Sequence, residues 1–496
     1  MSTPLQRLHN ALLLLTPYGG AGLVLLGLVH SGVIETLDLL LYDAVTTLRP
    51  TASARQLPIA IVGIEDSDIR RYGWPIDDGV LCRAIQNIRA HGARAIGLDL
   101  YRDQGVGAQK GCLPQLMQQE PRLISIFNAA EGIAAIPGSP PEQQAFNDLV
   151  VDADGVVRRD LVHVSGQDAA TVGLPLRLVE RAGAPPTLRQ QLEAGNRGFA
   201  RQPWLSSRAG GYRNLDAAGY QRLLPFLQPH SFAQLSLQEA ADPNDPGQLR
   251  QLQGRIVLIG STARSLKDVF QVPRSRLQPG THQYLMPGVE LHAVRTAALL
   301  RDQSEQPWRL HTAAPALEQG LELLMIGLGV ALGSTGRNLR RSVINTLGVL
   351  VLLSSSGIAL LWVAGLWLGL ALPMLSLPLM AGMGWLRRGA TSQRQRLEFQ
   401  RLLGQTTSPA VAQQLWEQRD LLLNDGRFPG RQLPVTVLFS DTCNFTTVSE
   451  QLTPAEVLDW LNRGMAVMVP AITRRGGMVN KFTGDGILAV FGAPGE

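Results

Sequence analysis

The sequence predicts a multidomain membrane protein with a large α/β domain, four transmembrane helices, of which one precedes that domain and three follow it, and a smaller α+β unit after them. Its composition is 45% hydrophobic and only 17% charged, which is more apolar than a typical soluble protein. Strands alternate with helices over the first half, and long uncharged stretches flank that region. A length of 496 residues allows about three domains.

The basic balance does not by itself indicate nucleic-acid binding. The net charge is +5 and the pI is near 9.4. A nucleic-acid footprint is normally a clustered basic patch, whereas the arginines here are dispersed and few aromatic residues lie among them. We therefore expect no nucleic-acid partner.

The segment 35–315 has the pattern of an α/β domain. Residues 58–64, 93–98 and 255–259 are apolar or β-branched runs typical of buried strands, and 77–91 has helical periodicity. Strands that alternate with helices favour a mostly parallel sheet. Acidic residues at the strand ends more often cap helices or close turns than form a catalytic set, and we expect His292 to pack or cap a helix.

Four apolar stretches predict transmembrane helices. The first, 11–34, is long enough to cross ~30 Å of hydrocarbon and is too long for a signal peptide, the alternative interpretation. The second, 316–335, has a short uncharged core because Glu318 and Glu322 precede it. The uncharged stretch 342–386 breaks at Ala364-Gly365, which predicts two helices, 342–362 and 366–386, joined by a tight turn.

Parity and flanking charge predict the topology. If segment 35–315 is outside and the C-terminal end inside, an odd number of crossings must follow residue 315, and three satisfy this. Arginines follow the second and fourth spans, as the positive-inside rule requires; they are Arg337, Arg340, Arg341, Arg387, Arg388, Arg394 and Arg396. Residues 1–10, the linker 387–434 and residues 435–496 are then cytoplasmic.

Motifs in the outer segment resemble the second type of the CHASE sensor domain of bacterial receptors. The resemblance covers most of residues 35–300 and rests on the order of the motifs more than on any one of them. It implies an extracellular sensor with an unknown ligand, in a multi-pass protein of the bacterial inner membrane. The motifs are Leu37-Asp38-Leu39-Leu40-Leu41-Tyr42-Asp43, Gly73-Trp74-Pro75, Ala95-Ile96-Gly97-Leu98-Asp99, Asp154-Gly155-Val156-Val157-Arg158-Arg159, Gly260-Ser261-Thr262 and Met286-Pro287-Gly288-Val289-Glu290-Leu291-His292.

The three cysteines do not have the spacing of a zinc site. Cys82 and Cys112 both fall in the proposed outer segment, where oxidation is permitted, and Cys443 falls inside. A Cys82–Cys112 disulfide is possible, but the sequence leaves it open because it gives no geometry.

The C-terminal segment carries two apolar strands that each deliver an aspartate. Residues 435–439 read as a buried strand that ends at Asp441, and residues 478–482 read as a strand that ends near Asp485. A long amphipathic helix, 454–474, lies between them. If it lets the two strands lie side by side, the two carboxylates would form a dication site.

This segment resembles the first half of the class III adenylyl and guanylyl cyclase domain, an α+β palm with a ferredoxin-like fold. Phe439-Ser440-Asp441 through Phe445-Thr446-Thr447 matches the first metal motif, and Lys481-Phe482-Thr483-Gly484-Asp485 the second. The resemblance implies conversion of ATP to cyclic AMP and pyrophosphate with two Mg²⁺ or Mn²⁺, and a homodimer. The implied metal ligands are Asp441, Thr442 and Asp485, and the implied substrate-binding residues are Lys481, Asn444, Phe445 and Thr446.

The chemistry suits these residue types. Two metal ions stabilise the attacking, bridging and leaving oxygens when a 3′-hydroxyl attacks the α-phosphorus, and carboxylate oxygens suit magnesium or manganese. In the family a lysine at the position of Lys481 selects adenine, which favours ATP over GTP. Asn444 stands where the family usually has glycine, and asparagine tolerates a positive φ.

The sequence ends at Gly495-Glu496, before the family's transition-state Asn and Arg. We therefore expect a truncated cyclase with no catalytic residue of this kind and negligible turnover of its own. A guanylate cyclase or a non-catalytic sensor protein are the alternatives. A diguanylate cyclase is disfavoured because its Gly-Gly-Asp/Glu-Glu-Phe motif is absent, and a histidine kinase because no histidine follows His311.

Overall fold

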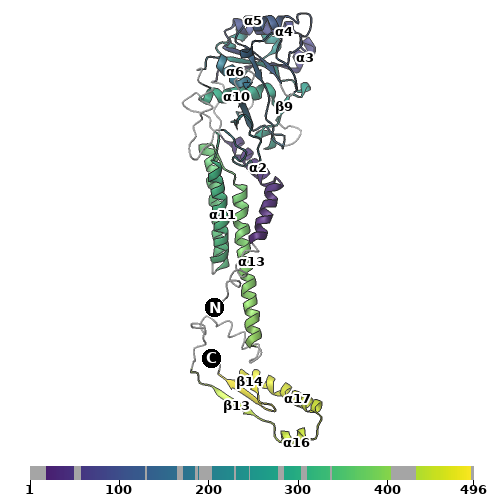
Figure 1. Ribbon diagram of the computed structural model, residues 1–496, viewed down its shortest axis with the longest axis vertical. Helices are drawn as coiled ribbons and strands as arrows, with labels where there is room; N and C mark the ends of the chain where they lie inside the picture. The colour runs from purple at the N-terminus through teal and green to yellow at the C-terminus, as the bar shows by residue number, and fades with distance from the viewer. Residues whose placement is uncertain are drawn as a thin grey trace. The chain divides into compact units, whose positions relative to one another are not determined.

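The computed structural model describes residues 18–49, 57–128, 131–164, 171–184, 188, 204–227, 231–244, 246–277, 284–302, 310–335, 338–403 and 432–492. The expected cytoplasmic N-terminus 1–10, the first residues of the first span and most of the linker lie outside these ranges. The chain forms two compact units, Met1–Met383 and Gly384–Glu496, whose elements are labelled in Figure 1.

A six-stranded sheet forms the middle layer of the first unit, in the order β4-β3-β2-β8-β1-β7. Every neighbouring pair in it is parallel, which confirms the expected parallel sheet. All residues of β1, β2 and β8 are buried, as is usual for parallel strands covered on both faces. The strands are β1 Ile59–Ile64, β2 Ala95–Asp99, β3 Leu123–Phe127, β4 Gln144–Phe146, β7 Ala233–Ser236 and β8 Ile256–Ser261.

Helices cover both faces of this sheet (Figure 1). One face packs against α4 (Asp78–Ala90), α5 (Cys112–Gln119) and α8 (Leu237–Ala241), through an apolar core that includes Leu81, Ile85 and Leu116. The other face packs against α6 (Leu174–Arg181) and α10 (Gly288–Asp302). The α/β architecture expected for the outer segment is therefore confirmed, as a doubly wound, three-layer domain. A short helix, α3 (Asp66–Tyr72), follows β1.

Short strands complete the domain. β5 (Arg159–His163) pairs antiparallel with β6 (Tyr220–Leu223), and β9 (Val269–Phe270) pairs antiparallel with β10 (Met286–Pro287). The possible disulfide is formed: Cys82 of α4 is joined to Cys112 at the start of α5, with their Cα atoms 6.4 Å apart. Cys443 is free and exposed.

The helix expected at 11–34 is interrupted. A helix over Tyr18–His30 is followed by α2 (Val33–Leu48), and the two axes differ by 61°. Gly32, with φ 76°, forms the break, because this left-handed conformation is costly for residues with a side chain. Asp38 and Asp43 of α2 are almost fully buried. After the bend, the carboxylate of Asp38 accepts from backbone N–H groups and that of Asp43 accepts from Arg158.

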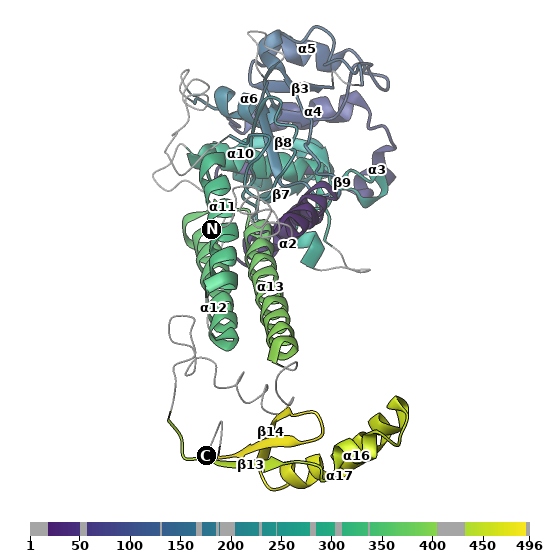
Figure 2. The same ribbon diagram turned by 60° about the horizontal axis from the view of Figure 1, so that its bottom comes forward.

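Two helices are long and apolar enough to cross a membrane: α11 (Pro315–Thr335) and the continuous helix Leu339–Ala364, which contains α12 (Leu339–Ala359). Figure 2 shows them side by side. The bent pair before residue 48 would add a third span if it counts as one. Four spans are not shown among the described residues. The fourth expected helix, α13 (Ala371–Leu403), starts later than 366, and Arg387 and Arg388 end its apolar part.

Polar contacts explain the acidic residues near the start of α11. Glu322 forms an ion pair with Arg213 of the α/β domain, and the Arg213 guanidinium lies 3.7 Å from Asp38. The backbone N–H groups of Leu370 and Ala371 donate to Asp38 at 2.7 and 2.8 Å. An arginine of the domain thus pairs with Glu322 of α11, whereas Glu318 Oε1 is buried without a hydrogen-bond partner among the described residues.

The second unit is a three-stranded antiparallel sheet with two helices, drawn in yellow tones in Figure 2. Its elements are β13 (Thr436–Ser440), α16 (Phe445–Ser449), α17 (Pro454–Thr473), β14 (Gly477–Phe482) and β15 (Ile487–Phe491). The expected strands and long helix are present. Thr453 and Glu456 form a capping box that starts α17, with the Pro454 ring in the first turn.

Two expectations for this unit are wrong. β13 and β14 are not adjacent, because the sheet order is β13-β15-β14. β13 is also not buried: Phe439 is 71% exposed and Val437 is 50% exposed. The small core, centred on Ile472, Ile487 and Ala489, lies where α17 covers β14 and β15, and β13 is outside that contact.

Candidate functional sites

A cavity of about 610 Å³ opens at the carboxyl edge of the parallel sheet. Asp99 ends β2, Ser261 ends β8, and Asn147 follows β4, so the ends of separate strands bring these three side chains to one wall. His292 of α10 and Asp268, which precedes β9, line the same cavity. In open α/β sheets ligands bind at this edge, where strand connections diverge to opposite sides.

Electrostatics in the cavity centre on Asp99 and His292. Burial, with a smaller contribution from Asp268, raises the pKa of Asp99 to about 7. Burial and then Arg295 hold the pKa of His292 well below its usual range, so this imidazole is neutral. Arg295 Nη1 can only donate and lies 3.1 Å from His292 Nδ1, which places the imidazole proton on Nε2. Nε2 faces Asp99 Oδ1 at 3.8 Å.

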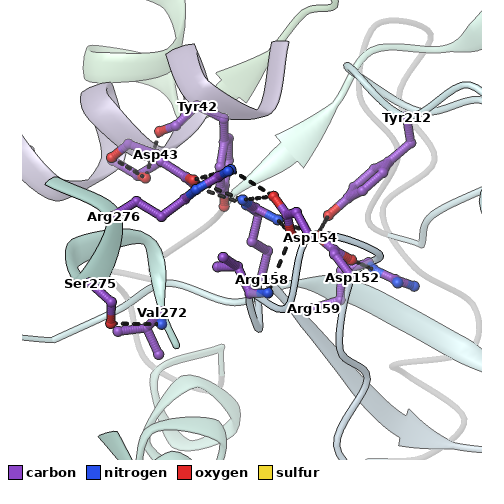
Figure 3. Close-up of polar contacts among 12 residues, drawn as sticks. Tyr42, Asp43, Asp152, Asp154, Arg158, Arg159, Tyr212, Val272, Ser275 and Arg276 are labelled. Carbon is purple, nitrogen blue, oxygen red and sulfur yellow. Dashed lines mark hydrogen bonds and ion pairs between the residues drawn. The ribbon is translucent and has the colours of Figure 1, made fainter. Parts of the chain in front are cut away.

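A buried polar cluster around Arg158 ties α2 to the domain (Figure 3). Arg158 is fully buried and its five N–H groups all donate to carboxylates. Two go to Asp43 of α2 at 2.7 and 2.8 Å, two to Asp154 at 2.9 and 2.7 Å, and one to Asp152 at 2.7 Å. We call Arg158 and these three aspartates, with Arg159, Tyr212 and Arg276, the Arg158 cluster.

The outer members of the Arg158 cluster satisfy the remaining carboxylate oxygens. Arg159 Nε donates to Asp152 Oδ1 at 2.7 Å, and the Tyr212 hydroxyl donates to Asp152 Oδ2 at 2.8 Å. Arg276 donates to Asp154 Oδ2 at 2.7 Å. Three arginines therefore balance three aspartates. The motif residues Asp43 and Arg158, which are 115 positions apart, form one contact between α2 and the sheet domain.

In the second unit the structure brings the segments that carry Asp441 and Asp485 side by side. Ser440, at the end of β13, pairs with Ile487 at the start of β15, and Asp485 lies in the turn that leads into β15. The Thr442 hydroxyl donates to the Asp485 carbonyl at 2.5 Å. A Cβ on Gly486 would lie 2.3 Å from the Ser440 carbonyl and 3.1 Å from Asp441 Oδ1, so only glycine allows this close approach.

The other predicted site residues lie around this turn. Asn444 is the N-cap residue of α16 and has φ 59°. It therefore adopts the left-handed conformation that asparagine tolerates. The Phe445 ring stacks near Trp460 of α17 at 6.4 Å between centroids, and Thr446 is exposed in the first turn of α16. Lys481 is exposed near the end of β14, next to a β-bulge. No described contact joins Lys481 to the aspartate pair.

The donor set fits hard dications in its chemistry. Asp441 is exposed and Asp485 is half-buried, and the two lie on adjoining segments. Carboxylate oxygens are ligands of the kind that magnesium and manganese prefer. No group of three or more His, Cys, Asp or Glu side chains among the described residues is arranged to hold a metal ion. Two carboxylates would fill only part of the coordination sphere of such an ion.

Sequence reasoning missed the cavity of the sheet domain. Asp99 was visible as an acidic residue at a strand end, but we expected such acidic residues to cap helices or close turns. Glu65 does so, because it forms a capping box with Asp68 at the start of α3. The strand order would have been needed to see that β2 and β8 are neighbours.

Comparisons with known proteins find one domain family and several relatives that match part of the chain. The CHASE2 domain family matches residues 20–332. Over 57 residues the chain is 42% identical to a terminal-differentiation specific adenylate cyclase of Dictyostelium discoideum, covering 12% of this chain and 3% of that protein. It is 40% identical to an adenylate cyclase of Anabaena cylindrica over 57 residues, covering 12% and 11%.

Over 116 residues the chain is 33% identical to an uncharacterized protein of Mycobacterium tuberculosis, covering 23% of this chain and 20% of that protein. The chain thus spans a fifth or less of the length of these relatives. No solved structure matches it. Because the matched CHASE2 region extends over well more than half of the sequence, the protein belongs to the CHASE2 domain family.

Proposed function

We propose that the protein is a transmembrane sensor of the bacterial inner membrane whose C-terminal unit is part of an adenylate cyclase that makes cyclic AMP and pyrophosphate from ATP. CHASE2 is an extracellular sensor domain, and the chain has candidate membrane helices, which together indicate a membrane protein. The observation that supports the enzymatic part is the pairing of the segments that carry Asp441 and Asp485, which brings Gly486 against Asp441.

In this proposal Asp441, Asp485 and the carbonyl of Thr442 hold two Mg²⁺ or Mn²⁺. When bound, the ions would stabilise charge on the attacking, bridging and leaving oxygens. Lys481 would bind the adenine ring, and Asn444, Phe445 and Thr446 would present the start of α16 to the phosphates. The cyclase unit would act as a homodimer. The N- and C-termini of the protein would both lie in the cytoplasm.

The test measures cyclic AMP formed from ATP with MnCl₂ in membranes that carry the protein translated from its complete reading frame. We expect product from the wild type and a loss of at least about 100-fold in Asp441→Ala and in Asp485→Ala, since each removes a metal ligand. Asp459→Ala is the matched control, because Asp459 is an exposed aspartate on α17 whose side chain is 69% exposed.

Two outcomes would overturn the proposal. One is the absence of any cyclic nucleotide from the wild type, which would favour a non-catalytic sensor. The other is equal product from the wild type and the Asp441→Ala variant. A parallel assay with GTP separates a guanylate cyclase from an adenylate cyclase, because the former makes cyclic GMP from GTP and the latter makes cyclic AMP from ATP.

A further inference from the structure

The cavity at the carboxyl edge of the sheet has the features of a ligand site. Its volume of about 610 Å³ lies in the range of small-molecule sites. Ser261 is 5% exposed and lines the cavity, and its Oγ has no hydrogen-bond partner among the described residues. A buried hydroxyl without a partner is costly, so a polar group that enters the cavity would satisfy it.

The walls are acidic. Asp99, Glu131, Asp148 and Asp268 all line the cavity. The two basic residues on the walls do not balance them. Arg102 lies 3.2 Å from Asp78 and donates to the carbonyls of Tyr101 and Ile76 at 3.1 Å, and His292 is neutral. The cavity therefore attracts a positive charge.

Aromatic rings complete the walls. Trp74, Tyr101 and Phe270 line the same cavity, and Trp74 is 45% exposed. Aromatic faces together with carboxylates are the groups that recognise organic cations in proteins. A bare metal ion fits less well, because no three acidic or histidine side chains among the described residues converge as metal ligands.

Neutral hydrogen-bonding groups lie beside the acids. The Asn147 amide donates to Asp99 Oδ1 at 3.2 Å and accepts from the Tyr101 hydroxyl at 2.9 Å. The Asn128 amide lies 3.4 Å from the same hydroxyl. These side chains fix one another, and the Ser261 hydroxyl remains available for a polar substituent of the ligand.

We propose that this cavity binds a small organic cation, a molecule with a protonated or quaternary amine and a neutral polar group. The proposal rests on the sensor function proposed above and names the class of ligand that the sensor reads. Asp268 and Asp99 would face the amine, the aromatic rings would cover it, and Ser261 would hydrogen-bond the polar group.

The test is ligand-dependent thermal unfolding of the full chain in detergent micelles, at constant ionic strength. The probes are a set of primary and quaternary amines that includes ethanolamine, putrescine and choline, with glucose, succinate and CaCl₂ for comparison. We expect at least one amine to raise Tm by roughly 2 °C or more in a saturable manner. Glucose, succinate and CaCl₂ should not raise it.

Variants place the effect in the cavity. Asp268→Asn and Ser261→Ala should raise the amine concentration that gives half of the maximal increase in Tm by at least about tenfold. Asp216→Asn should leave that concentration unchanged. Asp216 is an exposed aspartate outside the cavity, and its carboxylate accepts from the Ala218 N–H, as an amide oxygen also can. Circular dichroism of each variant without ligand checks that it folds.

The proposal is overturned if no amine stabilises the wild type, if both cavity variants respond as the wild type does, or if only succinate, glucose or calcium binds in the cavity. The measurement requires no nucleotide chemistry. A protein that binds the amine but makes no cyclic AMP would refute the proposed enzyme and leave this site standing, and the reverse result would refute the site alone.

Discussion

Replacement of Arg158 by methionine is expected to destabilise the sheet domain by about 3–5 kcal/mol, because it leaves the buried carboxylate of Asp43 without its two hydrogen bonds. Arg158 is fully buried, and Asp43 is 1% exposed. Methionine keeps much of the side-chain volume, so the loss reports the charge and its five hydrogen bonds and not a cavity. The measured quantity is Tm of the full chain, which should fall by roughly 10 °C.

Arg83→Met is the matched control. The Arg83 side chain is 46% exposed, and its ion pair with Asp242 at 3.3 Å lies at the surface, where such pairs contribute at most about 1 kcal/mol. A Tm for Arg158→Met that matches the Tm of Arg83→Met would contradict the account of the Arg158 cluster. Arg158→Lys should recover only part of the loss, because an ammonium cannot reproduce the guanidinium fork.

Asp99→Asn is expected to remove a large part of the dependence of stability on pH. The folded-state pKa of Asp99 is about 7, above the ordinary value of 3.8. The stability that this group contributes is therefore fully present below about pH 4 and is lost as pH rises toward about 7 and beyond. Three units of pKa correspond to roughly 4 kcal/mol. Asparagine stays neutral and can accept the same hydrogen bond from Asn147.

The measurement is Tm against pH between 5 and 8 for both proteins. The wild type should lose Tm across this window, and the difference between it and Asp99→Asn should grow with pH. The groups around Asp99 are Asn147, the neutral His292, Asp268 and Arg295, and they are the same in both proteins apart from Asp99 itself. Parallel curves would show that Asp99 does not titrate in this range.

The sheet domain could be predicted from the sequence to a large extent. The strands β1, β2 and β8 are apolar runs bounded by turn residues, and their burial on both faces explains why they appear in the sequence as continuous apolar runs. The strand order could not be predicted, because β8 inserts between β1 and β2 from more than 150 residues away. This insertion places Ser261 beside Asp99, so the cavity could not be predicted from local sequence patterns.

The membrane-proximal part was harder to predict. The apolar stretch 11–34 suggested one straight helix, but Gly32 bends the chain and α2 turns to bury Asp38 and Asp43. Hydropathy identifies apolar length and does not show which carboxylates find partners in a folded domain.

In the C-terminal unit the aspartate pair was predicted for a partly wrong reason. Asp441 and Asp485 were expected to meet because their strands would be neighbours, yet β15 lies between β13 and β14. Their segments adjoin because Asp485 lies in the turn that leads into β15, and β15 pairs with β13. The exposure of Val437 and Phe439 could not be read from their apolar character, since exposure depends on what packs against the strand.

The central claim is that Asp441 and Asp485 hold the dications of a nucleotide-cyclising site. Its most direct test is Mn²⁺ binding to the full chain without nucleotide, followed by electron paramagnetic resonance. The account predicts bound Mn²⁺ whose affinity falls about 10- to 100-fold when Asp441→Asn and Asp485→Asn are combined, and does not change in Asp459→Asn. Equal Mn²⁺ affinity in the double variant and the wild type would contradict it.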